Sequence, residues 1–203
     1  MIVSHSKRFI FIKTRKTAGS SLQKALGYAC APGDVLISHP SLMPGWGSIP
    51  EAFEGVTPHV GRDFIAEHFP REWSEYAKVT VERHPLEKVV SLYWWEMREQ
   101  REPLSFLRWF DSIADEDLTD FDRYGDADGR LLVDRVILVE NIEEDYRRCC
   151  RALDLAEMPL GREKADIRPR GDVAQTHFTG EALERMRRVF RRECDAFGYG
   201  IPG

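Results

Sequence analysis

The sequence has no apolar stretch long enough to cross a membrane, and its first residues do not resemble a secretory leader. No window approaches the ~18 apolar residues of a membrane span. The opening MIVSHSKRFIFIKT interrupts its only apolar run with a lysine. Cysteine is scarce, and Cys30, Cys149, Cys150 and Cys194 match no zinc spacing. We therefore expect free thiols in a cytoplasmic protein, bacterial by type.

An excess of positive charge is also missing. The 203 residues carry a net charge of −5, which argues against nucleic acid or a membrane surface as the main partner. The hydrophobic fraction of 42% and charged fraction of 31% are those of an ordinary globular protein. This length suits one α/β domain over residues 1–203, in which any basic site must be local.

Strand-like and helix-like segments alternate along the chain. Strands are expected at 8–14, 77–82 and 131–140, and each precedes a helix. Those helices are expected from Gly19 or Ser20 to Gly27, from Pro85 onward, and at 141–155 with Asn141 as its cap. Further helices are expected at 62–69, closed by Pro70, at 103–113 and at 181–199, with loops at 31–60 and 114–129. This order predicts a central, mainly parallel sheet flanked by helices on both faces.

The first strand-to-helix turn, KTRKTAGSS at 13–21, concentrates cations, hydroxyls and small residues. Small residues let the backbone wrap an anion at a helix N-terminus, and hydroxyls add donors. Lys16 precedes Gly19, so the order differs from the Walker A loop, in which lysine follows glycine. No carboxylate pair for a metal is evident. The turn predicts a phosphate cradle without a metal, with a polar, well-capped turn as the alternative.

A second group follows the strand at 77–82. Arg83 ends this strand, and Ser91 lies eight residues later on the next helix. A guanidinium and a hydroxyl can converge there on a further anion, although a surface ion pair would also explain Arg83. Two phosphate sites on neighbouring strand ends describe a nucleotide phosphorylated at both its 5′ and 3′ positions.

Both motifs resemble those of PAPS-dependent sulfotransferases, PAPS being 3′-phosphoadenosine 5′-phosphosulfate. KTRKTAGSSL is similar to the family's 5′-phosphosulfate loop, and VERHPLEKVVSLYWW to its 3′-phosphate segment. VDRVILVENIEEDYRRCCRALDL and FRRECDAFGY resemble later segments of bacterial members. The resemblance implies a P-loop-like nucleotide cradle, PAPS as donor, PAP as product and no metal. Arg15 stands where many relatives have proline, and it adds a cation to the loop.

The resemblance also implies roles for the residues of the two motifs. Lys16 would contact the oxygen that bridges phosphate and sulfate, and Arg83 with Ser91 would hold the 3′-phosphate. The residues that would hold the 5′-phosphate are Thr17, Ala18, Gly19, Ser20 and Ser21.

Transfer to a hydroxyl also needs a base. Histidine side chains ordinarily titrate near neutrality, so His59, in GVTPHVGRDF, is our first candidate. His39 and Glu82 remain alternatives. Arg168 and Arg170, in IRPRGDV, either fold over the nucleotide or belong to an exposed basic loop.

We expect a sulfotransferase that moves a sulfuryl group from PAPS to a hydroxyl or amine of a small-molecule or glycan acceptor. A Mg-dependent P-loop kinase and a non-catalytic PAP- or PAPS-binding protein are the alternatives. The sequence names neither the acceptor nor the oligomeric state.

Overall fold

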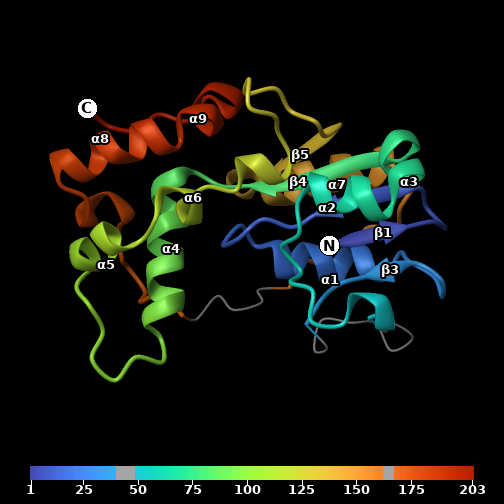
Figure 1. Cartoon of the computed structure of the whole chain (residues 1–203), viewed down its shortest axis with the longest axis horizontal. Coiled ribbons are helices and arrows are strands. Elements are labelled where there is room, and N and C mark those ends of the chain that lie inside the picture. The colour runs from blue at the N-terminus through green and yellow to red at the C-terminus, as the bar shows by residue number, and fades with distance from the viewer. Residues whose placement is uncertain (40–48, 162–166) are drawn as a thin grey trace.

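Five strands form one mixed sheet in the order β3-β1-β2-β4-β5 within residues 1–39, 49–161 and 167–203, which the computed structural model describes (Figure 1). The strands are β1 (Ile2–Ser4), β2 (Phe9–Ile12), β3 (Val35–Leu36), β4 (Ala77–Glu82) and β5 (Arg135–Leu138). β2, β4 and β5 are parallel, and β2 lies at the centre of the sheet.

The prediction of a mainly parallel sheet is wrong on one side. β1 runs antiparallel to both β2 and β3. Only residues 5–8 join β1 to β2, which is enough for a hairpin but too short for a parallel crossover. β3 lies inside the segment 31–60 that was predicted to be a loop, of which residues 40–48 fall outside the described residues.

The helices mostly follow the predicted segments. They are α1 (Gly19–Gly27), α2 (Arg62–His68), α3 (Pro70–Glu75), α4 (Pro85–Met97), α5 (Phe106–Ser112), α6 (Asp115–Leu118), α7 (Ile142–Ala152), α8 (Gly180–Val189) and α9 (Arg191–Phe197). Pro70 opens α3 instead of only closing α2, because proline is tolerated at the first position of a helix. α6 is a single helical turn within the predicted loop 114–129.

α7 begins at Ile142 with Asn141 at its N-cap position, as predicted, but the Asn141 side chain makes no capping hydrogen bond. One further prediction about the helices is wrong. The last helix is broken at Phe190 into α8 and α9. The break lets the two helices contribute to different cores. Met186 of α8 packs in the core formed by helices, and Phe197 of α9 packs in the core on one face of the sheet.

Helices cover both faces of the sheet, as the alternating pattern predicts. α1 and α7 pack on one face, against a core that includes Phe9, Phe11 and Val79. α2, α3 and the segment 121–124 pack on the other face, against Ile10 and Ile12. α4, α5 and α8 enclose a third, all-helical core and are grouped on one side of the molecule (Figure 1).

These layers make a single α/β domain. In the described part of the chain, no helix combines the length and the apolar character that a membrane crossing requires.

Candidate functional site

The turn between β2 and α1 has an unusual backbone. Lys16 and Ala18 adopt left-handed conformations, with φ of 60° and 56°, although neither is glycine. Left-handed residues within such turns are a feature of the concave backbone nests that bind anions. Two buried threonines stabilise the turn by hydrogen bonds. The hydroxyls of Thr14 and Thr17 lie 2.8 Å apart, and Thr14 also donates to the carbonyl of Val81 on β4. The turn is therefore held beside the N-terminus of α1, where the first N–H groups have no partner within the helix.

Gly19 lets the side chain of Lys13 run along the first turn of α1. A Cβ atom at Gly19 would lie 2.8 Å from Cγ of Lys13. The buried Lys13 ammonium donates to Ser20 Oγ at 3.1 Å and to Gln23 Oε1 at 3.0 Å. Lys13 was not among the predicted site residues. The sequence feature that could have indicated Lys13 is its position as the first cation of KTRKTAGSS, directly after the buried strand.

One face of α4 joins the two predicted motifs. At its start, Arg83 Nη2 lies 2.8 Å from Glu87 Oε2, and Arg168 Nη1 lies 2.5 Å from the same oxygen. Ser91 follows Glu87 by one helical turn, and Trp95 follows Ser91 by another. The Lys16 ammonium lies 4.2 Å from the centre of the Trp95 ring. α4 thus brings Lys16, Arg83, Ser91 and Arg168 together from three separate segments.

Asp172 fixes the position of Arg168. Its Oδ2 accepts from Arg168 Nε at 2.7 Å and from Trp94 Nε1 at 3.1 Å, and its backbone carbonyl accepts from Arg168 Nη2 at 2.7 Å. His177 Nε2 lies 2.5 Å from the other carboxylate oxygen. Asp172 was not among the predicted site residues, and its spacing of four from Arg168 was the signal available in the sequence. Arg170 is exposed, and none of these contacts involves it.

His59 lies against the β2–α1 turn. Its Nδ1 is 3.2 Å from the backbone carbonyl of Lys13. A carbonyl can only accept, so Nδ1 carries the proton and Nε2 keeps its lone pair. Burial and the nearby Lys13 lower the pKa of His59 to about 3, so the imidazole is neutral at neutral pH. His39, the first alternative base, is exposed.

Glu82, the second alternative base, belongs to a buried ion cluster. The Lys88 ammonium lies 2.9 and 3.0 Å from the two Glu82 oxygens and 3.1 Å from Asp120 Oδ2. Tyr124 donates its hydroxyl to Glu82 at 2.9 Å. Burial raises the pKa of Glu82 to about 7 in spite of Lys88. The carboxylate is inaccessible to a substrate, because none of the residue is exposed.

Asp120 connects this cluster to the turn and to His59. It accepts from the backbone N–H of Arg15 at 2.8 Å, from Arg15 Nε at 2.9 Å and from Arg123 Nε at 2.6 Å. Arg123 in turn donates to the carbonyl of His59. Burial acts to raise the pKa of Asp120, but Lys88, Arg15 and Arg123 outweigh it and hold that pKa well below its usual range. Arg15, predicted to be a cofactor-binding residue, thus anchors the turn from its flank in this structure.

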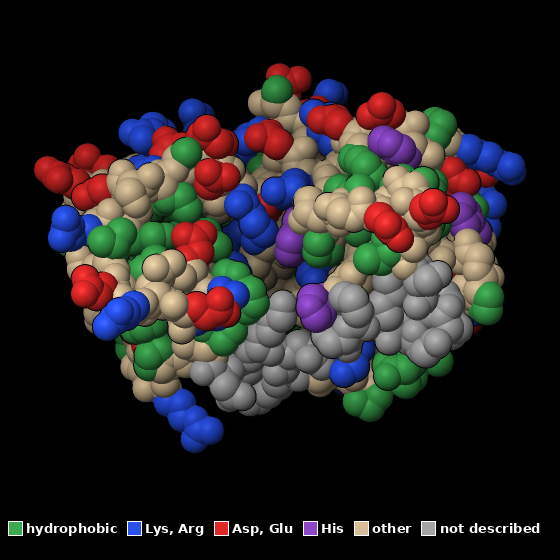
Figure 2. Space-filling view, turned by 60° about the horizontal axis from the view of Figure 1, so that its bottom comes forward, with side chains coloured by type: hydrophobic (Ala, Val, Ile, Leu, Met, Phe, Trp, Pro, Cys, Tyr) green, Lys and Arg blue, Asp and Glu red, His purple; other side chains and the backbone are tan. Residues whose placement is uncertain are grey.

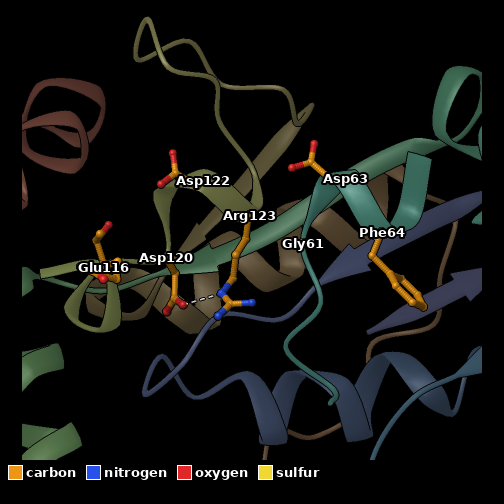
Figure 3. Close-up of a pocket in the computed structure, with 8 residues that line it drawn as sticks. Gly61, Asp63, Phe64, Glu116, Asp120, Asp122 and Arg123 are labelled. Atoms are coloured by element: carbon orange, nitrogen blue, oxygen red, sulfur yellow. Dashed lines mark hydrogen bonds and ion pairs between the residues drawn. The ribbon is translucent and has the colours of Figure 1, made fainter. Parts of the chain in front are cut away.

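A pocket of about 260 Å³ opens beside the His59 segment (Figure 3). It is lined by Gly61, Asp63, Phe64, Glu116, Thr119, Asp120, Asp122 and Arg123. In Figure 3, Arg123 reaches across to Asp120, while Asp63 and Asp122 extend from two facing segments. The pocket adjoins the site because Asp120 bonds Arg15 and Arg123 bonds the carbonyl of His59.

Positive charge is concentrated locally on one face of the molecule. The space-filling view of that face shows Lys, Arg and His side chains gathered in the groove between its two halves (Figure 2). Within the described ranges, no group of three or more His, Cys, Asp or Glu side chains is arranged to hold a metal ion. No protein-family model, curated protein or solved structure matches the chain.

Proposed function

We propose that the protein is a sulfotransferase that moves a sulfuryl group from PAPS to a hydroxyl or amine of an acceptor. The observation that carries the proposal is the meeting of Lys16, Arg83 and Arg168 along one face of α4. A helix rises 1.5 Å per residue, so Glu87 and Trp95 are separated by about 12 Å along it. A cradle at one end and two guanidiniums at the other suit a nucleotide with two separate anionic groups.

The residues present fit such a nucleotide. The backbone of Thr17–Ser21 would hold the 5′-phosphate at the N-terminus of α1. Arg83, Arg168 and Ser91 would hold the 3′-phosphate, and the fork of each guanidinium matches phosphate oxygens. PAPS, when bound, supplies an activated sulfuryl group and leaves as PAP. Lys16 would stabilise the negative charge that develops on the departing phosphate oxygen.

His59 is the proposed base. Its Nε2 would accept the proton of the acceptor hydroxyl as the acceptor oxygen bonds to sulfur and the bond from sulfur to the phosphate oxygen breaks. The hydrogen bond from Nδ1 to the carbonyl of Lys13 holds the tautomer that this step requires. An anionic nucleotide in the cradle would offset the charge of Lys13, which is the second cause, after burial, of the lowered pKa of His59. The adjoining pocket, with walls at 61–64 and 116–123, is the proposed acceptor entrance.

Calorimetric titration with PAP, AMP and ATP plus Mg²⁺ tests the proposal. PAP should bind best, and Arg83→Ala should weaken PAP by about tenfold or more while leaving AMP nearly unchanged, because only PAP carries the 3′-phosphate. Arg148→Ala is the matched control, since Arg148 forms a similar i,i+4 pair with Glu144 on the surface of α7. Failure to bind PAP would overturn the proposal, and preference for ATP with Mg²⁺-dependent turnover would favour a kinase instead.

A non-catalytic binder is separated by a second variant. His59→Ala should keep PAP affinity and lose transfer from labelled PAPS in an acceptor screen. A wild-type protein that binds PAP but transfers to no acceptor, not even slowly to water, would favour the binding protein.

A further inference from the structure

Two guanidinium groups meet on a single oxygen of Glu87. Arg83 Nη2 and Arg168 Nη1 lie 2.8 Å and 2.5 Å from Oε2 of that carboxylate. All three side chains are partly shielded from water, with exposed fractions of 24% for Arg83, 17% for Arg168 and 35% for Glu87. Both guanidiniums therefore depend on the same oxygen of Glu87, while Asp172 pairs with Arg168 from its other side.

Arg168 does not depend on Glu87 for its position. Asp172 accepts from two of its nitrogens, through a carboxylate oxygen and through the backbone carbonyl, each at 2.7 Å. Trp94 on α4 bonds the same carboxylate at 3.1 Å, which ties this segment to the helix. The guanidinium of Arg168 would stay in place if the Glu87 side chain turned away.

Glu87 is the most exposed member of the trio and lies in the first turn of α4, where its side chain can rotate into water. Its carboxylate occupies the space between the two guanidiniums that an incoming anion would need. A singly charged anion that replaced it would leave the charge of the site unchanged. A phosphate monoester carries close to two charges above its second pKa of about 6, and its three acceptor oxygens could bond both guanidiniums at once, so it would gain more from displacing Glu87 than a singly charged anion would.

We propose that Glu87 is an internal anion that fills the two-arginine site, and that a terminal phosphate monoester must displace it to bind. Glu87 thereby makes the site selective for doubly charged phosphate over singly charged groups. The inference rests on the proposed function, since the ligand group in question would be the 3′-phosphate of PAPS and PAP. It deepens that proposal by naming the residue that sets the affinity for this phosphate.

Calorimetry on the full chain at pH 8 tests the inference with three probes: PAP, AMP and inorganic phosphate. Glu87→Gln should tighten PAP roughly tenfold, the scale of one charge-assisted contact that no longer has to be broken, and should leave AMP within about twofold. Inorganic phosphate should also bind more tightly to this variant. Adding Arg168→Ala to Glu87→Gln should abolish both gains. Glu144→Gln, which breaks an exposed i,i+4 pair with Arg148, should change nothing.

The outcomes separate this inference from the proposed function. Weaker or unchanged binding of both PAP and phosphate by Glu87→Gln, with a normal circular dichroism melt, would overturn the inference and show that Glu87 only orients the arginines. Glu87→Ala provides a second measure if the glutamine variant melts early, and it should show the same gains. A gain for phosphate without any PAP binding would support the internal anion and overturn the sulfotransferase proposal. PAP binding by the wild type, without tighter binding in the variants, would overturn the internal anion and leave the sulfotransferase proposal standing.

Discussion

Replacing Lys88 by methionine should destabilise the protein strongly. The Lys88 side chain is 2% exposed, and its ammonium is shared by Glu82 and Asp120, whose side chains are fully buried. Methionine fills a similar volume but leaves these carboxylates without their common cation. Removing one partner of a buried ion pair typically costs about 3–5 kcal/mol of the free energy of unfolding. For a chain of this size each kcal/mol lowers the Tm by about 2–4 °C, so we expect a loss of about 6–20 °C.

Urea unfolding at pH 7 and a thermal melt measure the effect. Lys7→Met is the matched control. Among the described residues the exposed Lys7 ammonium contacts the backbone carbonyl of Asp154 alone, at 3.4 Å, so its loss should change the free energy of unfolding by less than about 0.5 kcal/mol. Adding Glu82→Gln to Lys88→Met should restore part of the loss, since the neutral amide needs no counter-charge. A loss below about 1 kcal/mol for Lys88→Met alone would refute the reasoning that buried charge, rather than packing, dominates here.

Three further outcomes follow from the same contacts. Because the folded-state pKa of Glu82 is raised from 4.5 to about 7, the folded protein binds its proton more tightly, and this group lowers the free energy of unfolding as pH rises through that window. The free energy of unfolding of the wild type, measured in urea, should therefore fall by on the order of 2 kcal/mol between pH 5 and pH 7 relative to that of Glu82→Gln. If the free energies of the two proteins changed in parallel with pH, the raised pKa of Glu82 would be contradicted. The His59 imidazole should not titrate between pH 5 and 8 by NMR, because burial and Lys13 lower its pKa to about 3; a midpoint near 6.5 would place it outside the site. Gly19→Ala should cost about 1–3 kcal/mol in a thermal melt, because its Cβ would press on Lys13 Cγ, and an unchanged melt would show that Lys13 moves aside freely.

Local patterns in the sequence predicted the segments that carry the site. β2, α1 and β4 begin and end close to the predicted boundaries, and α4 begins at Pro85 as predicted, because the hydrophobic pattern of each segment is local, Gly27 ends α1 and Pro85 opens α4. β1 and β3 were missed. Three residues and two residues are too few to show a period, and these strands exist only through pairing with each other and with β2.

The contacts within the site were less predictable. Arg168 meets Arg83 only through Glu87, and no local rule links positions so far apart in the chain. Lys88 lies next to Val89 and Val90 in the sequence, where a lysine is normally expected to face water, yet buried carboxylates from β4 and from the 114–129 segment surround it. Asp120 belongs to an acidic stretch predicted to be a loop, and its pairing with Arg15 and Arg123 depends on the tertiary fold.

The face of α4 that carries Glu87, Ser91 and Trp95 has a consequence for chain length. These positions align only because each is one helical turn from the next. Inserting one residue between Ser91 and Trp95 would rotate everything beyond it by about 100°, carrying Trp95 away from Lys16 even though no side chain had been changed. The same insertion in the 98–105 connection would leave that alignment intact. Within α4 the protein should therefore tolerate many exchanges of residue type but very few changes of length.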